Sequence, residues 1–326
     1  MSTPTRASAT ARLRTVLKSI LFLLFYLAPH AFAQTGAPKA DAPMPPPPVL
    51  ELVVLGSGGP GAVGRASSSF VVLLDGIPRI LIDAGSGAFA RLGETKLSLD
   101  RLDRILLTHL HIDHSAELPG IFKARAVASR GAINFHVFGP SGAGKFPSTK
   151  RFVDLLFGKH GAFAYLADFS APITIVTTDI GATLSRTRKL QTLLAKDGLK
   201  ITAIAGHHDD APSIIYRIDY KNRSVVFSGD IDAAGLDNLR SIADHCNLLV
   251  FNTVVLDRPQ SAEALYTLHT PPKSIGEVAA SAHVGALLLT HLNPAIDQAH
   301  DDVLASIHRN YAGPVTFAED RLRIAP

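Results

Sequence analysis

Short apolar runs, each ending in a polar or glycine-rich turn, recur along the chain from Leu50 onward. Most are too short for helices and are rich in valine, isoleucine and leucine, which is typical of buried strands. The pattern predicts strands at residues 50–55, 67–74, 79–82, 104–107, 134–138, 173–178, 200–205, 213–220, 224–227 and 286–289.

Longer segments between these strands predict a helix that begins at Ala88 and helices at residues 116–129, 150–157 and 274–283. The second half of the chain repeats the order of the first, and the sequence LLTH ends a predicted strand in each half, at 106–109 and 288–291. This arrangement predicts an α/β fold, a four-layer αββα sandwich with mixed sheets, whose strand ends converge along one edge.

Residues 141–200 are less regular. They hold one predicted helix and one predicted strand, and the stretch 158–172 is loop-like and aromatic. We interpret this segment as an insertion near the functional site that contributes to substrate choice. The alternative is that its lysines and aromatic residues form a solvated rim and a small separate core.

A glycine-rich stretch, GSGGPG at residues 56–61, follows the first predicted strand. It matches the GxGxxG pattern of dinucleotide-binding folds, which requires a helix directly after the glycines. The next predicted element is instead the strand at residues 67–74, so the context argues against nucleotide binding.

The first 33 residues have the features of a secretory signal peptide. Basic residues extend to Lys18, an apolar run covers residues 20–28, and Ala31-Phe32-Ala33 is a small-x-small cleavage motif. We expect a signal peptide at 1–33, a Pro/Ala-rich linker at 34–48 and one folded domain at 49–326, with the mature protein periplasmic or secreted. The apolar run is too short for an ordinary membrane span, so none is expected after cleavage; an uncleaved anchor is the alternative.

Charge and cysteine content narrow the function classes. Lys+Arg total 32 against 28 Asp+Glu, and four of the basic residues lie in the predicted signal peptide, which has no acidic residue. The remaining chain is formally neutral, which gives no compositional support for nucleic-acid binding. Cys246 is the only cysteine, so an internal disulfide is excluded even in an oxidising compartment.

The strongest chemical signal is the sequence THLHIDH at residues 108–114. Three histidines and one aspartate follow a buried strand within six residues, and imidazole and carboxylate are the ligands that zinc prefers at catalytic sites. The alternative, a histidine-rich surface loop, is less consistent with the further ligands that follow later strands. The cluster therefore predicts a metal site at a strand end.

Three later strands also end in residues that bind metals. The strand at 200–205 leads into Gly206-His207-His208, the strand at 224–227 into Ser228-Gly229-Asp230, and the strand at 286–289 into Thr290-His291. Because all these ends are expected at one edge of the sandwich, they supply the ligands that the first cluster lacks.

These motifs together resemble the metallo-β-lactamase fold superfamily, and the resemblance covers nearly all of the chain from Leu50 onward. The motifs are HxHxDH at 109–114, GHH at 206–208, FSGD at 227–230 and the final TH at 290–291. Within the superfamily the chain is most similar to the ribonuclease Z and arylsulfatase-like branch, through HDDAPS at 208–213, Tyr216-Arg217 and Leu268-His269-Thr270. Class B β-lactamases lack a bridging aspartate on an SGD strand, so Asp230 argues against that branch.

The resemblance implies two metal ions, expected to be Zn²⁺ with other divalent metals as alternatives. One ion would be held by three histidines and the other by Asp113 and two histidines, with an aspartate bridging them; the complete set is His109, His111, His208, Asp113, His114, His291 and Asp230. A shared carboxylate lowers the repulsion between the two ions, and such a pair lowers the pKa of a shared water from 15.7 to about 7.

The resemblance also implies two catalytic roles. Asp113 would orient the hydroxide as well as bind metal, and His269 would be the general acid or orient the substrate. For His269 the alternative is a histidine at a helix start that bonds to the backbone. Of the adjacent His207 and His208, only one can point inward from an extended segment; we favour His208, although glycine follows this ligand in many relatives and Asp209 follows it here.

The expected function is that of an exported dinuclear zinc hydrolase, arylsulfatase-like, that cleaves a small sulfate ester or phosphodiester with a metal-bound hydroxide. The alternatives are a β-lactamase or lactonase-type hydrolase and a non-enzymatic metal-binding protein on the same fold. The expected partner is a small anionic ester, with no nucleic acid, and a homodimer is one oligomeric state to test.

Overall fold

The computed structural model describes residues 46–129, 131–184, 189–209 and 211–326. The predicted signal peptide and all but the last residues of the predicted linker lie outside this part of the chain. None of the helices in the described ranges is long and apolar enough to cross a membrane.

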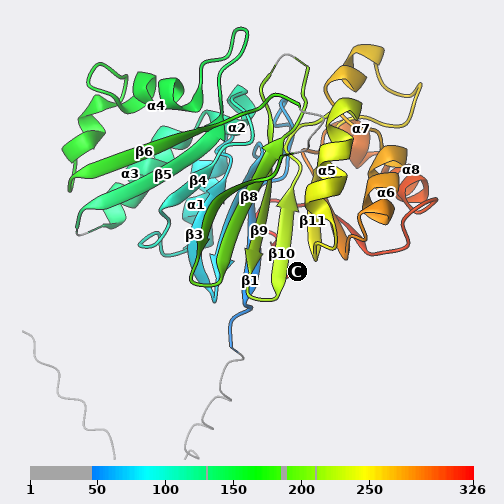
Figure 1. Cartoon of the computed structure of the whole chain (residues 1–326), viewed down its shortest axis with the longest axis horizontal. Helices are drawn as coiled ribbons and strands as arrows, with labels where there is room; N and C mark the ends of the chain where they lie inside the picture. Colours follow the sequence, from blue (N-terminus) through cyan, green and yellow to red (C-terminus); the bar gives the residue numbers. More distant parts are fainter. Residues whose placement is uncertain (1–45, 130, 185–188, 210) are drawn as a thin grey trace, which may run out of the picture. The chain divides into compact units, whose positions relative to one another are not determined.

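Six strands of the first half of the domain form a seven-stranded mixed sheet together with one strand from the carboxyl-terminal end of the chain (Figure 1). Its strands up to β3 pair antiparallel, whereas β3 to β6 pair parallel. In spatial order the strands are β14 (Arg323–Ile324), β1 (Leu50–Gly56), β2 (Ser69–Leu74), β3 (Ile77–Ile82), β4 (Arg104–Leu106), β5 (Ile133–Pro140) and β6 (Ile173–Ile180).

The second half forms a second seven-stranded sheet with the same design. The strands β7 to β10 pair antiparallel, and β10 to β13 pair parallel. The strands are β7 (Gln191–Lys196), β8 (Leu199–Ala205), β9 (Ile214–Tyr220), β10 (Arg223–Phe227), β11 (Leu248–Asn252), β12 (Ala286–Thr290) and β13 (Val315–Phe317).

Helices connect the parallel strands within each half, as parallel pairing requires. In the first half they are α1 (Ala88–Thr95), α2 (Ile112–Ser115), α3 (Leu118–Ala128), α4 (Thr149–Phe157) and the 3₁₀ turn η1 (Ala164–Asp168). In the second half they are η2 (Ala233–Gly235), α5 (Leu236–Ala243), η3 (Glu263–Thr267), α6 (Pro272–Ser281), α7 (Pro294–Asp297) and α8 (His300–Ile307).

Three apolar layers show how the elements stack. On β1, Leu52 and Val54 lie in a cluster with residues of the second sheet, whereas Val53 and Leu55 lie in a cluster with α1 and α3. A third cluster joins the second sheet to α5, α6 and α8. Successive side chains of a strand point to opposite faces, so both faces of each sheet are buried. The predicted αββα sandwich with mixed sheets is confirmed.

The strand predictions hold with small shifts in bounds, but the interpretation of residues 141–200 as an insertion is wrong in part. Strands β6 and β7 are the edge strands of the two sheets. Only α4 and η1 lie outside the sheets, and α4 packs on α3 through Phe157 and Phe122, whose ring centroids lie 4.8 Å apart. The sequence pattern missed β7 because four of its six residues are exposed, which leaves no apolar run.

The two sheets are joined next to the strand ends that carry the chemical motifs. The Tyr216 hydroxyl of β9 donates to Leu107 O at 2.9 Å, and Ile214 N donates to Thr108 O at 2.8 Å. Gly229 adopts φ +58°, and a Cβ there would lie 2.8 Å from the Thr108 Cβ, so only glycine fits between the halves. The strand ends of both sheets are thereby fixed against each other.

Candidate metal centre

Three histidines from both halves of the domain converge at the first part of the site. His109 and His111 follow β4, and His208 follows β8. His111 Nδ1 lies 3.0 Å from His109 Nε2 and 3.3 Å from His208 Nε2. The structure therefore brings together His109, His111 and His208, the three histidines that the resemblance assigns to one metal ion.

The second part of the site lies beside the first. Asp113 and His114 lie on α2, and His291 follows β12. His291 Nε2 lies 3.0 Å from His114 Nε2 and 3.1 Å from Asp113 Oδ2. All three side chains are buried, at 7%, 0% and 0% exposed. These are the residues that the resemblance assigns to the second ion.

Asp230 lies between the two groups. Its Oδ2 is 3.9 Å from His109 Nε2 and 3.6 Å from His208 Nε2 in the first group. The same oxygen is 3.7 Å from His114 Nε2 and 3.5 Å from His291 Nε2 in the second group. A single carboxylate oxygen thus faces both groups, which is the geometry of a bridging ligand.

The tautomers of three histidines test whether the site fits cations. His114 Nδ1 lies 2.8 Å from Asp83 Oδ2, which accepts hydrogen bonds, so the proton is on Nδ1. His208 Nδ1 donates to Leu268 O at 2.7 Å. In each ring the other nitrogen, Nε2, faces the site and has a lone pair when the ring is neutral. Lone pairs that face one another repel unless a proton or a metal ion lies between them, so these residues fit a metal pair.

His109 is oriented in the same way through Thr108. The Thr108 hydroxyl donates to Asp83 Oδ2 at 2.8 Å, and it lies 3.1 Å from His109 Nδ1. Because the hydroxyl proton is used by Asp83, its oxygen accepts from His109 Nδ1. The Nε2 lone pair of His109 also faces the site.

The carboxylates give the site a strong preference for positive charge. Burial raises the pKa of Asp113, but the hydrogen bond to His291 and the nearby histidine charges outweigh it and hold the pKa at about 2. Burial likewise opposes ionisation of Asp230, yet His291 and His114 hold its pKa well below the usual range. Among the described residues, no lysine or arginine forms an ion pair with Asp113 or Asp230.

The histidine pKa values follow the same charges. Burial lowers the pKa of His109 well below its usual value, so this ring is neutral. Burial also acts to lower the pKa of His114, but Asp230 and Asp83 raise it to about 9. Without a cation the site therefore takes up a proton at His114, and a metal ion would compete with that proton.

Asp83 is a functional residue that the sequence reading did not single out. It lies at the end of β3 with φ +54°, and its carboxylate accepts from Thr108 N at 2.7 Å as well as from the Thr108 hydroxyl and His114. Asp83 thus orients His114 directly and His109 through Thr108, although it does not face the metal centre. The signal was present in the sequence, since Asp83 follows a predicted strand parallel to the one that carries the histidine cluster.

We expect Asp83→Asn to lower the affinity for the second metal ion by about 10- to 100-fold, because loss of such an orienting partner has that cost. The amide NH₂ would face the Nδ1 proton of His114 and force the other tautomer. Calorimetric metal titration of the metal-free protein measures the change. Asp103→Asn, at a carboxylate paired with Arg104 outside the site, is the control; equal affinities in wild type and Asp83→Asn would contradict the assignment.

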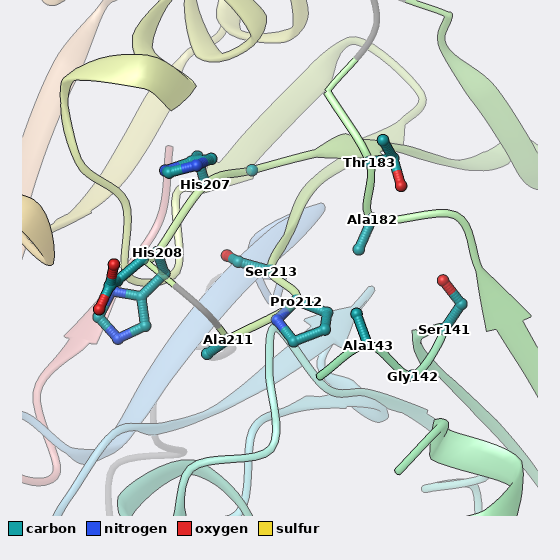
Figure 2. Close-up of a pocket in the computed structure, with 12 residues that line it drawn as sticks. Ser141, Gly142, Ala143, Ala182, Thr183, His207, His208, Ala211, Pro212 and Ser213 are labelled. Carbon is teal, nitrogen blue, oxygen red and sulfur yellow. The ribbon is translucent and has the colours of Figure 1, made fainter. Parts of the chain in front are cut away.

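His207 and His208 point in different directions, as Figure 2 shows. His208 is 2% exposed and reaches the metal centre, whereas the side chain of His207 is 39% exposed and its Nδ1 lies 2.7 Å from Asp232 Oδ2. The geometry therefore favours His208 as the candidate ligand. A pocket of about 150 Å³ lies beside this segment, lined mainly by small residues of the 141–143, 182–183 and 211–213 segments.

His269 lies next to the site, between η3 and α6. Its ring centroid is 5.3 Å from that of His208 and 5.8 Å from that of His291, and it is 5% exposed. Its Nδ1 is buried without a hydrogen-bond partner among the described residues, so the side chain does not serve the backbone as a helix-start histidine would. Burial lowers its pKa to about 4, so the free ring is neutral at pH 7.

A second group of metal-binding residue types lies at the opposite edge of the second sheet. Asp244, His245 and His283 are exposed and lie in the turns that precede β11 and β12. The two imidazole rings stack with an interplanar angle of 9°. Lone pairs in parallel planes do not converge on one point, so this group does not form a ligand set comparable to the buried one.

A family model described as "Beta-lactamase superfamily domain" matches residues 78–292, about two-thirds of the chain and the part that contains every candidate metal ligand. The chain belongs to this superfamily. As a member with the metallo-β-lactamase fold, it is a metal-dependent hydrolase, as the sequence predicted, with candidate metal-binding clusters of histidine and aspartate.

Curated relatives match this superfamily member over most of their length. Ribonuclease Z of Mycobacterium avium (strain 104) is 28% identical over 285 residues, which cover 85% of this chain and 98% of the relative. Ribonuclease Z of Mycobacterium marinum (strain ATCC BAA-535 / M) is 28% identical over 289 residues, with the same coverage. The predicted similarity to the ribonuclease Z branch is confirmed.

Solved structures share the fold. The metallo-β-lactamase fold protein YhfI of Bacillus subtilis has a TM-score of 0.64 at 20% identity and covers 84% of this chain and 98% of its own. The short form of human tRNase Z has a TM-score of 0.64 at 21% identity, with the same coverage. Zn²⁺-bound PqqB of Methylobacterium extorquens has a TM-score of 0.60 at 14% identity, covering 85% of this chain and 100% of that chain.

One expectation from the sequence is wrong. The neutral charge of the domain led us to expect a small anionic ester as the substrate and no nucleic acid. The curated relatives are ribonucleases, which conflicts with that expectation. Net charge failed as a guide because it averages over the surface, whereas a nucleic acid contacts only the part of the surface around the site.

Proposed function

We propose that the chain is a dinuclear metal-dependent phosphodiesterase. The observation that carries this proposal is the position of Asp230, whose Oδ2 lies 3.5 to 3.9 Å from ligand nitrogens of both histidine groups. Two divalent ions bound there would activate a shared water and stabilise the charge of an in-line displacement at phosphorus. The ribonuclease Z relatives support phosphodiesters as the substrate class.

The protein residues prepare this reaction by position and charge. Asp113, whose pKa is held at about 2, is ionised at neutral pH and accepts a hydrogen bond from the attacking water. His269 has a ring nitrogen free of protein partners and lies beside both ligand groups, where it hydrogen-bonds an oxygen of the ester.

We propose zinc as the metal. Five imidazoles and two carboxylates match its ligand preferences, whereas magnesium and calcium favour sites made of oxygen ligands. The Zn²⁺-bound state of PqqB, which shares the fold, is consistent with this choice.

RNA is the natural substrate class to test first, because the relatives are named ribonucleases. An aryl sulfate is the second, since a sulfate monoester and a phosphodiester each have one negative charge and a tetrahedral centre. A lactam has a planar carbonyl carbon instead of a tetrahedral centre, and its leaving group is the ring nitrogen. The proposed site has no group placed to stabilise that nitrogen as it leaves.

We expect the zinc-loaded protein to hydrolyse bis(4-nitrophenyl) phosphate, with far smaller kcat/KM for penicillins and cephalosporins. Release of nitrophenolate measures the first activity and loss of lactam absorbance the second; an RNA oligonucleotide and 4-nitrophenyl sulfate complete the panel. A kcat/KM for a lactam well above that for the phosphodiester would contradict the proposal, while the metal ligands could still stand.

We propose further that the mature protein is exported, with residues 1–33 as the signal peptide, 34–48 as the linker and 49–326 as the hydrolase domain. Support comes from the basic, apolar and Ala31-Phe32-Ala33 segments of the sequence. Amino-terminal sequencing of the protein recovered outside the cytoplasm is expected to begin at Gln34. An intact amino terminus in the membrane fraction would favour an uncleaved anchor.

A further inference from the structure

His291 differs from the other candidate ligands in how it is held. Three of the other four histidines have a hydrogen-bond partner on the side away from the metals. His291 has none among the described residues: its Nδ1 is fully buried and unpaired, and its backbone adopts φ +59°. A ligand ring without such a bond must be oriented by packing.

The packing partner is the backbone of the glycine-rich loop. A Cβ built on Gly59 would lie 3.0 Å from His291 Nδ1 and 3.1 Å from His291 O, so the loop rests against this residue and a side chain at position 59 would have to displace it. Gly59 N donates to Leu292 O at 2.9 Å, and Leu292 N donates to Ser57 O at 2.9 Å. The loop is therefore bonded to the residue that follows the ligand.

The loop is held in turn by one carboxylate near the carboxyl end of the chain. Asp320 Oδ1 accepts from Ser57 N at 3.0 Å and from the Ser57 hydroxyl at 2.9 Å. Its Oδ2 accepts from Ala66 N and from Arg91 Nε, both at 2.9 Å. With four donors on two oxygens and only 10% of its side chain exposed, Asp320 fixes Ser57 at the start of the loop and Ala66 in the segment that follows it.

Arg65 donates a hydrogen bond to Ser57 from the side opposite Asp320. Its Nη1 donates to the Ser57 hydroxyl and to Ala318 O, both at 2.9 Å, and its Nη2 lies 2.8 Å from Asp297 Oδ1. The Ser57 side chain thus lies between the Asp320 carboxylate and an arginine, which determines the path of the loop toward Gly59.

We propose that Asp320 is a positioning residue for His291 and acts through the glycine-rich loop, residues 56–61. The inference rests on the proposed dinuclear site. It gives the loop, whose sequence matches a nucleotide-binding pattern, the role of orienting a metal ligand. Asp320 does not contact the metal centre. It fixes Ser57, the loop is then held at Gly59, and the Gly59 backbone limits the orientation of the His291 ring.

Asp320→Asn is the direct test, because the amide removes one acceptor oxygen with little change in volume. An NH₂ group at either position would face an N–H donor. Glu51→Gln is the matched control: Glu51 also pairs with an arginine of the carboxyl-terminal segment, Arg323, at 2.6 and 2.8 Å, but it does not touch the loop.

The readouts are cobalt(II) titration of the metal-free proteins, followed by absorbance, and thermal unfolding of the same samples. We expect Asp320→Asn to lower the affinity for the second cobalt ion, at Asp113, His114 and His291, by about 10- to 100-fold, the range for loss of an orienting partner. The affinity for the first ion should not change. Glu51→Gln is expected to bind both ions as the wild type does, with a comparable fall in Tm. Unchanged affinity for the second ion in Asp320→Asn, or the same loss in Glu51→Gln, would overturn the inference.

Gly59→Ala tests the contact itself and does not depend on how Asp320→Asn folds. The added methyl would press on the His291 ring while every Asp320 hydrogen bond is kept. The affinity for the second ion should therefore fall again, and the affinity for the first should not. Wild-type binding by Gly59→Ala would contradict the steric step. A wild-type protein that binds a single ion would instead contradict the proposed dinuclear site.

Discussion

The Asp230→Ala protein is expected to lose affinity for both metal ions and to lose turnover of bis(4-nitrophenyl) phosphate by on the order of 10³-fold or more. The reason is that one carboxylate oxygen faces both histidine groups, and the metal pair supplies several kcal/mol of transition-state stabilisation, with about 1.4 kcal/mol for each tenfold in rate. Elemental analysis and steady-state kinetics on the same sample measure the two effects.

Asp232→Asn is the matched control for this change. Asp232 follows in the same loop, but its carboxylate bonds to His207 and to Ala234 N and does not face the metals. It should retain both ions and the wild-type rate. Retention of two full equivalents of metal by Asp230→Ala would show that the aspartate is not a bridge.

The His269→Ala protein is expected to keep both ions and to turn over poorly activated phosphodiesters about 10² to 10⁴ times more slowly, the usual contribution of a positioned acid or base. The ring lies within 6 Å, centroid to centroid, of two candidate ligands and has an unpaired buried nitrogen. The loss should be smaller for nitrophenyl esters, whose leaving group needs no proton.

A series of diesters with leaving groups of graded pKa separates the two roles open to His269. A loss that grows with leaving-group pKa indicates proton donation, whereas an equal loss across the series indicates orientation of the ester. His136→Ala is the control, because His136 is an exposed histidine on β5 remote from these contacts. A metal content below two ions in His269→Ala would show that the residue supports metal binding instead.

The sequence predicted the candidate ligands because each follows a strand that ends at the same edge. His109, Asp230 and His291 could be placed there once the two halves were seen to repeat, since the apolar runs fixed where each strand ends. Alternation indicated that only one of His207 and His208 points inward, and the buried position of His208 favours it as that residue. The positions of the strand ends needed only local pattern and the shared direction of the strands, whereas the division of the ligands between two ions came from the resemblance to the metallo-β-lactamase fold superfamily.

The remaining parts of the site depend on contacts between residues far apart in the chain. Asp83 and His114 are 31 residues apart, and Ser57 and Asp320 are 263 residues apart. No local pattern shows that a carboxylate near the end of the chain holds a loop near its start. The glycine-rich loop could therefore be excluded as a nucleotide site, but its contact with His291 could not be derived.

Each candidate metal group takes residues from both halves of the chain, and this has a consequence for assembly. A metal ion between His111 and His208 closes a loop of 97 residues, and one between His114 and His291 closes a loop of 177 residues. Such ions act as two cross-links, which reduce the conformational entropy of the unfolded chain more as the closed loop lengthens. Neither link could form before His208 and His291 have been synthesised, so binding of such ions would follow synthesis of the second half and would join the two sheets.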